Sequence, residues 1–251
     1  MGIAGVARPV SAAGQDGPRA EGVREPDVAR LAAEVDWDGA LPPRASGVSW
    51  RAAKAMKRAL DVVGALMLLV VLSPLLLLVA LVVAVDGGVP ALYEWRVVGR
   101  RGRLFTGYKF RTMVRGADRL KADLNHLNEM TGPVFKIRED PRVTRVGRLL
   151  RRYSLDELPQ LWSVLLGDMS LVGPRPLFPH EFAACPPALR AKLAVTPGMT
   201  CVWQVSGRSE IKDFEEWVRL DLVYIRDWNL WLDIKILVRT ALAVVSGRGA
   251  H

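Results

Sequence analysis

Residues 60–85 read LDVVGALMLLVVLSPLLLLVALVVAV, and this stretch decides how the rest of the chain is arranged. Its apolar run is interrupted only by Asp61, Gly64, Ser73 and Pro74. As a straight helix, residues 62–85 would be about 36 Å long, which exceeds the roughly 30 Å hydrocarbon core of a bilayer. A buried core helix is the alternative, but a run this long and this apolar is typical of a membrane segment.

Two features bear on whether this segment crosses the membrane or turns back. Pro74 removes a backbone hydrogen bond and clashes with the preceding turn, so we expect a break at Ser73-Pro74. Positive charge marks the cytoplasmic side, and here it flanks both ends, at Arg51, Lys54, Lys57 and Arg58 before the run and at Arg96, Arg100, Arg101 and Arg103 after it. We therefore predict a re-entrant helix-break-helix hairpin over residues 51–86, with a kinked spanning helix as the alternative.

The remaining chain divides into two parts. Residues 1–50 are rich in Ala, Gly, Pro, Arg and acids and predict a disordered extension, within which a short helix at Val28–Val35 is the one weak pattern. Residues 87–251 predict a small, mainly helical α+β domain. Its expected strands are Ala91–Tyr93 and Leu104–Phe110, and its expected helices are Gly116–Met130, Thr144–Arg152, one ending at Gly167, and several across Asp213–Val245.

The last third of the chain alternates aromatic and basic residues along helical patterns. The aromatic residues are Phe214, Trp217, Tyr224, Trp228 and Trp231, and the basic ones are Lys212, Arg219, Arg226, Lys235 and Arg239. Such a mixture fits amphipathic helices lying at a membrane surface. The same tryptophans could instead pack the domain core, and the pattern leaves both interpretations open.

Composition limits the partners and the compartment. The net charge of +9 and the pI near 10 indicate an anionic partner, which is nucleic acid, anionic lipid or a phosphorylated substrate. Two cysteines, Cys185 and Cys201, cannot build a disulfide framework, so we expect a reducing compartment. Their spacing and the three histidines give no soft-metal site. The first apolar run starts too late for a signal peptide.

The adjacent acids Asp156 and Glu157 are the candidate reaction centre. Taken alone, Ser154 to Glu157 has the pattern of a capping box, or Asp156 itself caps a helix with Pro159 in its first turn. Cations surround the pair in sequence and in neighbouring motifs, at Lys109, Arg111, Arg148, Arg151, Arg152 and Arg175. Each of these could be a solvated surface charge, but together they offer several phosphate ligands.

This combination of residues favours phosphoryl transfer. A carboxylate can attack phosphorus and form an acyl phosphate, while Mg²⁺ bound through carboxylates neutralises a diphosphate. Two prolines stiffen Gly173-Pro-Arg-Pro176, so Arg175 can be presented with little loss of entropy. No Gly-x-x-x-x-Gly-Lys loop is present, which argues against a nucleoside triphosphatase.

Several motifs follow one another in a fixed order after the Ser73-Pro74 break. They are KFRTM at 109–113, DPRVTRVG at 140–147, SLDELPQ at 154–160, GDMSLVGPRP at 167–176, TPGMT at 196–200 and WQVSGR at 203–208. From about Met56 to Val245 the chain thereby resembles the bacterial sugar transferases, which are monotopic polyprenyl-phosphate phosphoglycosyl transferases of a small type. It departs from that pattern at Trp95, Val97, Ser163 and Cys201, which bears on local contacts and on the sugar accepted.

The resemblance implies a role for each motif. Asp156 would be the covalent nucleophile, Glu157 would bind Mg²⁺ together with it, and Ser73-Pro74 would be the hairpin break. The residues that would bind the substrate or its phosphates are Lys109, Arg111, Arg151, Arg175, Gln204 and Arg208.

The resemblance also implies a reaction and a location. A sugar 1-phosphate would pass from a UDP-sugar to an undecaprenyl or decaprenyl phosphate with release of UMP, as the first membrane step of exopolysaccharide, capsule or other glycan synthesis. The protein would sit in one leaflet of the bacterial inner membrane, with its active site on the cytoplasmic face. We expect no nucleic-acid partner and leave open an oligomer and contacts with downstream glycosyltransferases. The alternative is a non-catalytic, basic scaffold that binds anionic lipid.

Overall fold

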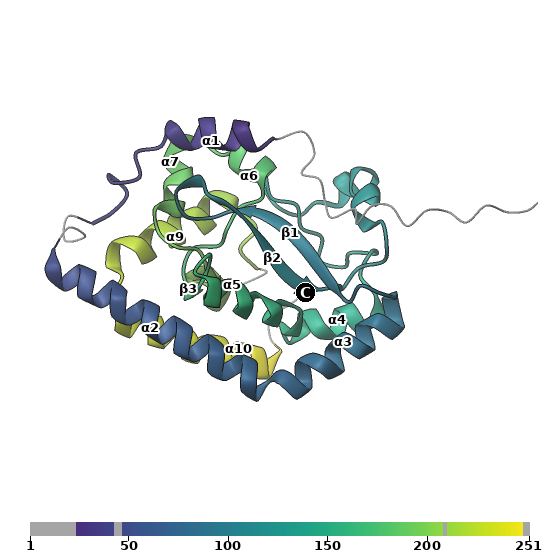
Figure 1. The fold of residues 1–251 in the computed structure, drawn as a ribbon. Coiled ribbons are helices and arrows are strands. Elements are labelled where there is room, and N and C mark those ends of the chain that lie inside the picture. Colours follow the sequence, from purple (N-terminus) through teal and green to yellow (C-terminus); the bar gives the residue numbers. More distant parts are fainter. Residues whose placement is uncertain (1–23, 43–46, 208–209, 248–251) are drawn as a thin grey trace, which may run out of the picture.

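A bent helical arm runs along one side of the molecule, and the other elements stack on it (Figure 1). The computed structural model describes residues 24–42, 47–207 and 210–247. The arm consists of α2 (Val48–Val71) and α3 (Ser73–Gly87), which meet at an angle of 63°. Within the described residues no single helix is long and apolar enough to cross a membrane, whereas α2 and α3 together meet that criterion of length and composition.

The predicted break lies where the sequence places it, and its cause is visible. Pro74 has no backbone N–H to donate to the carbonyl of Val70, four residues earlier. The hydroxyl of Ser73 donates to that carbonyl instead, at 2.8 Å. Leu72, between the two helices, leaves helical geometry with φ −89° and ψ 1°. The serine therefore satisfies a carbonyl that the proline leaves without a partner.

Lys57 ties the first half of α2 to the domain above it. Its ammonium donates to the carbonyl of Val172 at 2.9 Å and to the carboxylate of Asp233 at 2.7 Å. Asp233 is buried and also accepts hydrogen bonds from the Tyr224 hydroxyl and the Trp228 indole. One lysine thus links α2 to β3 (Ser170–Val172) and to α10 (Leu230–Ser246).

Two further polar side chains of α2 complete this attachment. The guanidinium of Arg58 donates to the carbonyls of Val164 and Leu165, at 2.6 and 2.8 Å, near the end of α5 (Leu161–Leu166). The carboxylate of Asp61 accepts the backbone N–H of Leu171 at 3.0 Å. These contacts fix the middle turns of α2 to α5 and β3. Trp50, in the first turn of α2, is also buried and packs edge-on against Trp228.

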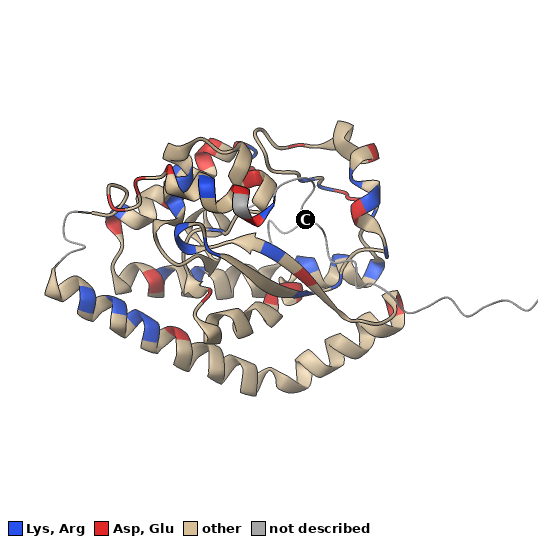
Figure 2. Cartoon of the chain, turned by 45° about the horizontal axis from the view of Figure 1, so that its top comes forward, with Lys and Arg blue, Asp and Glu red and all other residues tan. Residues whose placement is uncertain are grey.

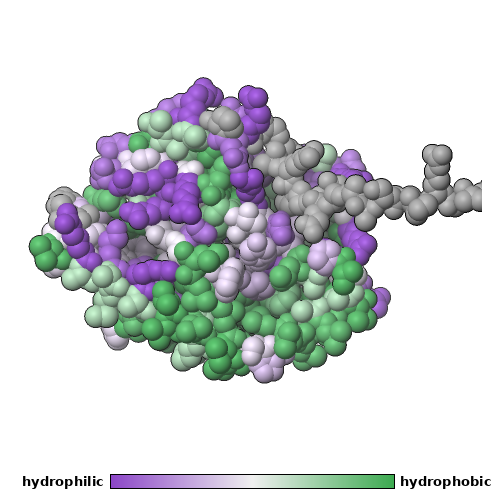
Figure 3. Space-filling model, viewed as in Figure 1, coloured by the Kyte–Doolittle hydropathy of each residue, from purple (hydrophilic) through white to green (hydrophobic). Residues whose placement is uncertain are grey.

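The outer face of the arm is apolar and uncovered. Val79 and Val83 of α3 pack inward with Phe110 and Leu150. Outward-facing residues remain exposed, among them Val63, Leu66, Met67, Val70, Val71, Leu77, Leu78, Leu81 and Val85. Figure 3 shows an apolar surface along the lower side of the molecule, and Figure 2 shows that charge disappears from the arm between Asp61 and Asp86. An exposed apolar patch of this extent is typical of a membrane or protein contact.

Two small sheets lie above the arm. Strand β1 (Leu92–Val98) pairs antiparallel with β2 (Leu104–Phe110), and β3 pairs parallel with β4 (Gly198–Thr200). The prediction for β2 is confirmed. The first strand is longer than the predicted Ala91–Tyr93, because Trp95, Val97 and Val98 are buried and continue the pairing to the hairpin turn η2 (Arg100–Gly102).

The predicted helix Gly116–Met130 is wrong. The structure has two short 3-10 helices there, η3 (Ala117–Leu120) and η4 (Ala122–Leu127). Gly116 adopts a left-handed φ of 73°, and the Asn128 amide donates to the carbonyls of Met130 and Val134. Side chain to backbone bonds of this kind compete with helix formation. By contrast α4 (Arg145–Arg152) forms as predicted, and the hydroxyl of Thr144 caps it by accepting the N–H of Gly147.

The C-terminal helices resolve the question about the aromatic residues. The remaining elements are η5 (Leu155–Gln160), α6 (Pro179–Ala184), α7 (Pro187–Arg190), η6 (Ala191–Ala194), α8 (Val202–Val205) and α9 (Phe214–Asp227). Phe214, Trp217, Tyr224 and Trp228 are buried and belong to the core. Trp231 on α10 is 60% exposed. The interfacial interpretation therefore fails for four of the five aromatic residues, whose rings pack between helices.

Part of the N-terminal extension is ordered, contrary to the prediction for residues 1–50. Helix α1 (Glu25–Ala33) covers the weakly predicted helix and buries Val28 and Ala32 against the domain. Arg190, itself buried, donates to the carbonyl of Leu31. Local composition did not reveal these partners, which lie more than 60 residues away in sequence. Residues 1–23 lie outside the described residues.

The buried position of Lys57 predicts a large effect on stability. Replacing Lys57 with Met leaves the Asp233 carboxylate buried without its cation, which should lower the free energy of unfolding by about 3 kcal/mol. Lys54→Met, one turn earlier on the exposed side of α2, should change it by less than about 0.5 kcal/mol. Denaturant unfolding of both variants in the same detergent checks this. Equal effects in the two variants would show that the ion pair does not anchor α2.

Candidate active site

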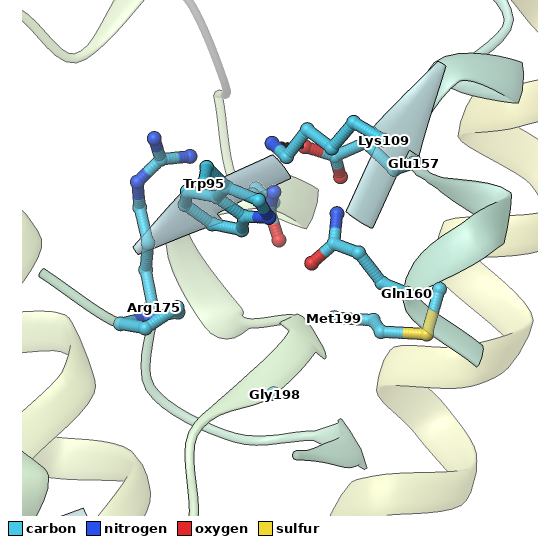
Figure 4. A pocket seen from close by; sticks show the side chains of 9 residues that line it. Trp95, Lys109, Glu157, Gln160, Arg175, Gly198 and Met199 are labelled. Carbon is cyan, nitrogen blue, oxygen red and sulfur yellow. Dashed lines mark hydrogen bonds and ion pairs between the residues drawn. The ribbon is translucent and has the colours of Figure 1, made fainter. Parts of the chain in front are cut away.

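An open cleft brings together residues from four separate parts of the chain (Figure 4). β1 and β2 supply one side and η5 supplies the second, while the loop after β3 together with β4 and α8 supplies the rest. The lining residues are Trp95, Lys109, Glu157, Gln160, Arg175, Pro176, Gly198, Met199 and Gln204. Four of the predicted site residues, namely Lys109, Glu157, Arg175 and Gln204, therefore meet in one place.

The backbone around the acidic pair differs from both capping predictions. Ser154 has a left-handed φ of 53°, and its side chain does not cap η5. A capping residue requires an extended backbone, so Ser154 cannot form the predicted capping box. Instead it ends the turn after α4 and starts a 3-10 helix that packs against β2. This turn places Glu157 beside Lys109, which is 48 residues away in sequence.

Glu157 and Lys109 form an ion pair within the cleft. The distance between the ammonium nitrogen and Oε1 is 2.7 Å, and both side chains are mostly shielded from solvent. One carboxylate and one ammonium thus neutralise each other at the wall of the cleft. Since an ammonium has three donors, Lys109 can bind phosphate oxygens while it keeps Glu157 in place.

Asp156 lies next to this pair, and the pKa of its carboxyl is raised. Burial raises the pKa of its carboxyl to about 6, and the neighbouring Glu157 contributes to the rise. Lys109 and Arg151 oppose this shift. At neutral pH the carboxyl is therefore mostly ionised, but its negative charge is poorly solvated. Its own backbone N–H donates a hydrogen bond that favours the ionised form. A poorly solvated carboxylate of this kind suits a nucleophile.

The other predicted cations occupy different positions. Arg151 is held by the Thr112 hydroxyl at 3.0 Å, and Asp156 partly offsets the lowering of its pKa by burial. Arg111 follows the last residue of β2 and turns away from the cleft, donating to the carbonyl of Gly88 at 3.3 Å. Arg111 is not among the residues that line the cleft, and its role in binding phosphate stays a prediction. Arg208 lies outside the described residues.

The loop that carries Arg175 is fixed on both sides by backbone hydrogen bonds. The N–H of Gly173 donates to Thr200, and the N–H of Gly198 donates to Pro174, at 3.0 and 2.9 Å. A Cβ added at Gly198 would lie 2.0 Å from the backbone nitrogen of Gly173, so the close contact requires glycine. The half-buried guanidinium of Arg175 therefore extends into the cleft from a rigid base.

Several lining residues were not predicted. Gln160 lies in the SLDELPQ motif and Met199 in the TPGMT motif, but neither side chain is charged, so neither was proposed as a phosphate ligand. Trp95 was noted only as a departure from a family pattern. The signal that could have identified Trp95 is its pairing with Gly107 across β1 and β2, because directly paired residues lie on the same face of the sheet.

The donor set suits Mg²⁺ only if the substrate also contributes. No cluster of three or more His, Cys, Asp or Glu residues occurs in the described chain. Asp156 and Glu157 provide two carboxylates, and Mg²⁺ is commonly held by one or two carboxylates together with substrate phosphates. Neither soft ligands nor a closed cage is present. The residues present thus fit a metal ion that is shared with a diphosphate.

The sequence of the chain is similar to a known protein family and to several characterised relatives. Residues 52–247 match the family model described as bacterial sugar transferase. The chain is 44% identical over 194 residues to the galactosyl transferase CpsE of Streptococcus agalactiae serotype III, covering 77% of this chain and 43% of that protein. It is 43% identical over 205 residues to the undecaprenyl-phosphate galactose phosphotransferase of Salmonella typhimurium, covering 80% and 43%.

A third relative is the UDP-glucose:undecaprenyl-phosphate glucose-1-phosphate transferase of Caulobacter vibrioides, which is 39% identical over 203 residues, covering 78% of this chain and 72% of that protein. The chain thus spans less than half the length of the first two relatives and most of the third. The matched region contains the arm from residue 52 onward, the acidic pair and every residue of the cleft. The chain belongs to the bacterial sugar transferase family.

Proposed function

We propose that the protein transfers a sugar 1-phosphate from a UDP-sugar to a polyprenyl phosphate and releases UMP. The observation that carries this proposal is the placement of Asp156 and Glu157 among Lys109, Arg151 and Arg175, beside an uncovered apolar arm. The names of the Salmonella and Caulobacter relatives describe transfer of sugar phosphates to undecaprenyl phosphate. We further propose that this is the first membrane step in building a surface glycan.

The reaction proceeds through two displacements at one phosphorus atom. A carboxylate oxygen of Asp156 attacks the sugar-bearing phosphorus of the UDP-sugar, and the bond to the bridging oxygen breaks with its electrons leaving on UMP. The resulting acyl phosphate carries the sugar. A phosphate oxygen of the polyprenyl phosphate then attacks the same phosphorus, and the Asp156 carboxylate leaves. The product is a polyprenyl diphosphate sugar, so atoms and charges balance.

The surrounding residues stabilise charge during both displacements. Lys109 and Arg175 face the cleft and would bind the diphosphate oxygens, while Arg151 balances Asp156 before and after the acyl phosphate forms. Gln204 also lines the cleft and would hydrogen-bond to the substrate. Asp156 and Glu157 would hold Mg²⁺, which neutralises the charge on the diphosphate and leaving group.

We assign the arm to a re-entrant hairpin over residues 51–86, with the catalytic domain, residues 87–251, on the cytoplasmic face of the inner membrane. Basic residues flank both ends of the arm, and its outer face is apolar between Asp61 and Asp86. On α10, the exposed side chains of Trp231, Val238 and Leu242 extend this apolar surface beyond the hairpin. A monotopic position would keep the cleft near the headgroups, where the phosphate of the lipid acceptor lies.

A basic scaffold that binds anionic lipid is the second candidate, favoured by the net charge of +9. It would need the arm and the exposed cations but would place no demand on a poorly solvated carboxylate at Asp156. Covalent chemistry at that residue therefore distinguishes the two functions.

The nucleophile is tested by mass spectrometry of the intact protein. Incubation with Mg²⁺ and each member of a panel of UDP-sugars should give an adduct with the mass of one sugar phosphate. Asp156→Asn should abolish the adduct and slow UMP release by roughly a thousandfold or more. Asp123→Asn, at an exposed acid of η4, is the matched control and should behave as the wild type. Lipid binding without adduct or UMP release would favour the scaffold.

Metal dependence provides a second test. Because only two carboxylates are available, chelation by EDTA should stop UMP release, and added Mg²⁺ should restore it. Glu157→Gln should raise the Mg²⁺ concentration that gives the half-maximal rate, since one of the two ligands loses its charge. A rate that is unaffected by EDTA would exclude the metal from the reaction.

The topology is tested by labelling single cysteines with an impermeant maleimide. Cys185 and Cys201 are buried and can be replaced first. Cysteines placed at the exposed positions Arg51 and Asp86, on either side of the arm, should both stay unlabelled in intact cells with a permeable outer membrane and both react after lysis. Labelling of only one of them in intact cells would mean that the arm spans the membrane.

A further inference from the structure

Trp95 occupies a position in the cleft that only glycine on the facing strand allows. It lies on β1 directly opposite Gly107 on β2. A Cβ added at Gly107 would lie 2.4 Å from the indole nitrogen of Trp95, and 3.0 and 3.1 Å from two carbons of its ring. The indole ring therefore lies across the glycine. Phe178 packs against it edge-on with ring centroids 5.4 Å apart, and Trp95 is only 3% exposed.

The Lys109 ammonium lies over the face of this ring. Its nitrogen is 4.3 Å from the ring centroid of Trp95 and 2.7 Å from the Glu157 carboxylate. A cation at this distance is attracted by the negative face of the aromatic ring, most strongly where water is excluded. Two attractions from different directions thus determine where the ammonium sits. Figure 4 shows Trp95 between Arg175 on one side and Lys109 with Glu157 on the other.

The choice of tryptophan is explained by its ring and not by its N–H group. In the described part of the chain the buried indole nitrogen has no hydrogen-bond partner. An unpaired buried donor is unfavourable, and phenylalanine would fill a similar place without one. Tryptophan, however, has the strongest cation–π attraction of the aromatic residues. The ring face toward Lys109 is therefore the property that favours tryptophan here.

We propose that Trp95 is a positioning residue that holds the Lys109 ammonium at the wall of the cleft, where it can contact both Glu157 and a diphosphate. Without the ring, the flexible lysine would keep only its bond to Glu157 and would sample other positions. Gly107 belongs to the same device, because any side chain there would displace the ring. The proposal rests on the proposed function in so far as the diphosphate is its ligand.

Binding of UDP, used as the probe with Mg²⁺, tests the effect on the ligand. Trp95→Leu keeps an apolar side chain but removes the ring, and it should weaken UDP binding by about tenfold. Trp95→Phe keeps an aromatic face and loses no observed hydrogen bond, so it should restore part of the affinity. Gly107→Ala should resemble Trp95→Leu although it leaves the lining residues unchanged. Gly87→Ala, where an added Cβ meets nothing within 4 Å, is the matched control.

A second measurement reports on Lys109 without any substrate. Acetylation of Lys109 by an N-hydroxysuccinimide ester, followed by mass spectrometry of the full chain, should be severalfold faster in Trp95→Leu and Gly107→Ala than in the wild type. Thermal unfolding shows whether each variant remains folded. In a Lys109→Met background, Trp95→Leu should cause no further loss of UDP affinity, because its effect passes through the lysine.

The outcomes separate this proposal from the proposed function. If Trp95→Leu keeps the UDP affinity and the acetylation rate of the wild type, the positioning role is overturned. The same holds if Trp95→Leu weakens UDP binding as much in the Lys109→Met background as it does in the wild type. If the wild type neither binds UDP nor releases UMP, while acetylation of Lys109 still accelerates in Trp95→Leu, the proposed function fails and the positioning role stands. Should Trp95→Leu not fold, Gly107→Ala and Trp95→Phe decide by the same two readouts.

Discussion

The attachment of α2 to the domain is the constraint on which the other features depend. Lys57, Arg58 and Asp61 are polar, buried or half-buried, and directed at the domain, whereas the following 24 residues carry no charge. The helix therefore changes character along its length, from a docking element to an apolar one. Because the docking contacts reach α5 and β3, the elements that frame the cleft are fixed relative to the apolar face. These contacts therefore help to set how far the cleft lies from a membrane into which the arm inserts.

The chemistry of the cleft depends on the different surroundings of two neighbouring acids, Asp156 and Glu157. Glu157 is neutralised by a close ammonium, while Asp156 is crowded by protein and keeps a raised pKa. A local turn produces this difference, since Ser154 in its left-handed conformation directs the two side chains into different surroundings. The cations come from distant segments and so require the full fold. The acidic pair thus gains its character only when β2, α4 and η5 are assembled.

Local patterns predicted those parts of the structure that local forces determine. The break at Pro74, the strand β2 and the helix after Thr144 follow from proline geometry, alternation and capping, and all three are present. The helix predicted over residues 116–130 is wrong: Gly116 has a left-handed φ at its start, and at its end the Asn128 side chain binds the carbonyls of Met130 and Val134. The family resemblance assigned Lys109 to phosphate binding, but it did not predict the ion pair with Glu157, because no spacing rule joins residues 48 positions apart. Trp95 and its glycine were missed as a pair because their relation exists only across two strands.

Helix α1 has a consequence for where the folding unit starts. The region shared with relatives begins at residue 52, but Val28 and Ala32 belong to the same core cluster as Val98, Leu177 and Phe182. A chain trimmed to the shared region would present that apolar surface to water and leave Arg190 without one of its carbonyl partners. Aggregation of such a shortened protein would then reflect a missing piece of its core and not a faulty catalytic domain. The region that defines the family, which starts at residue 52, is therefore shorter than the stable folding unit, which includes α1.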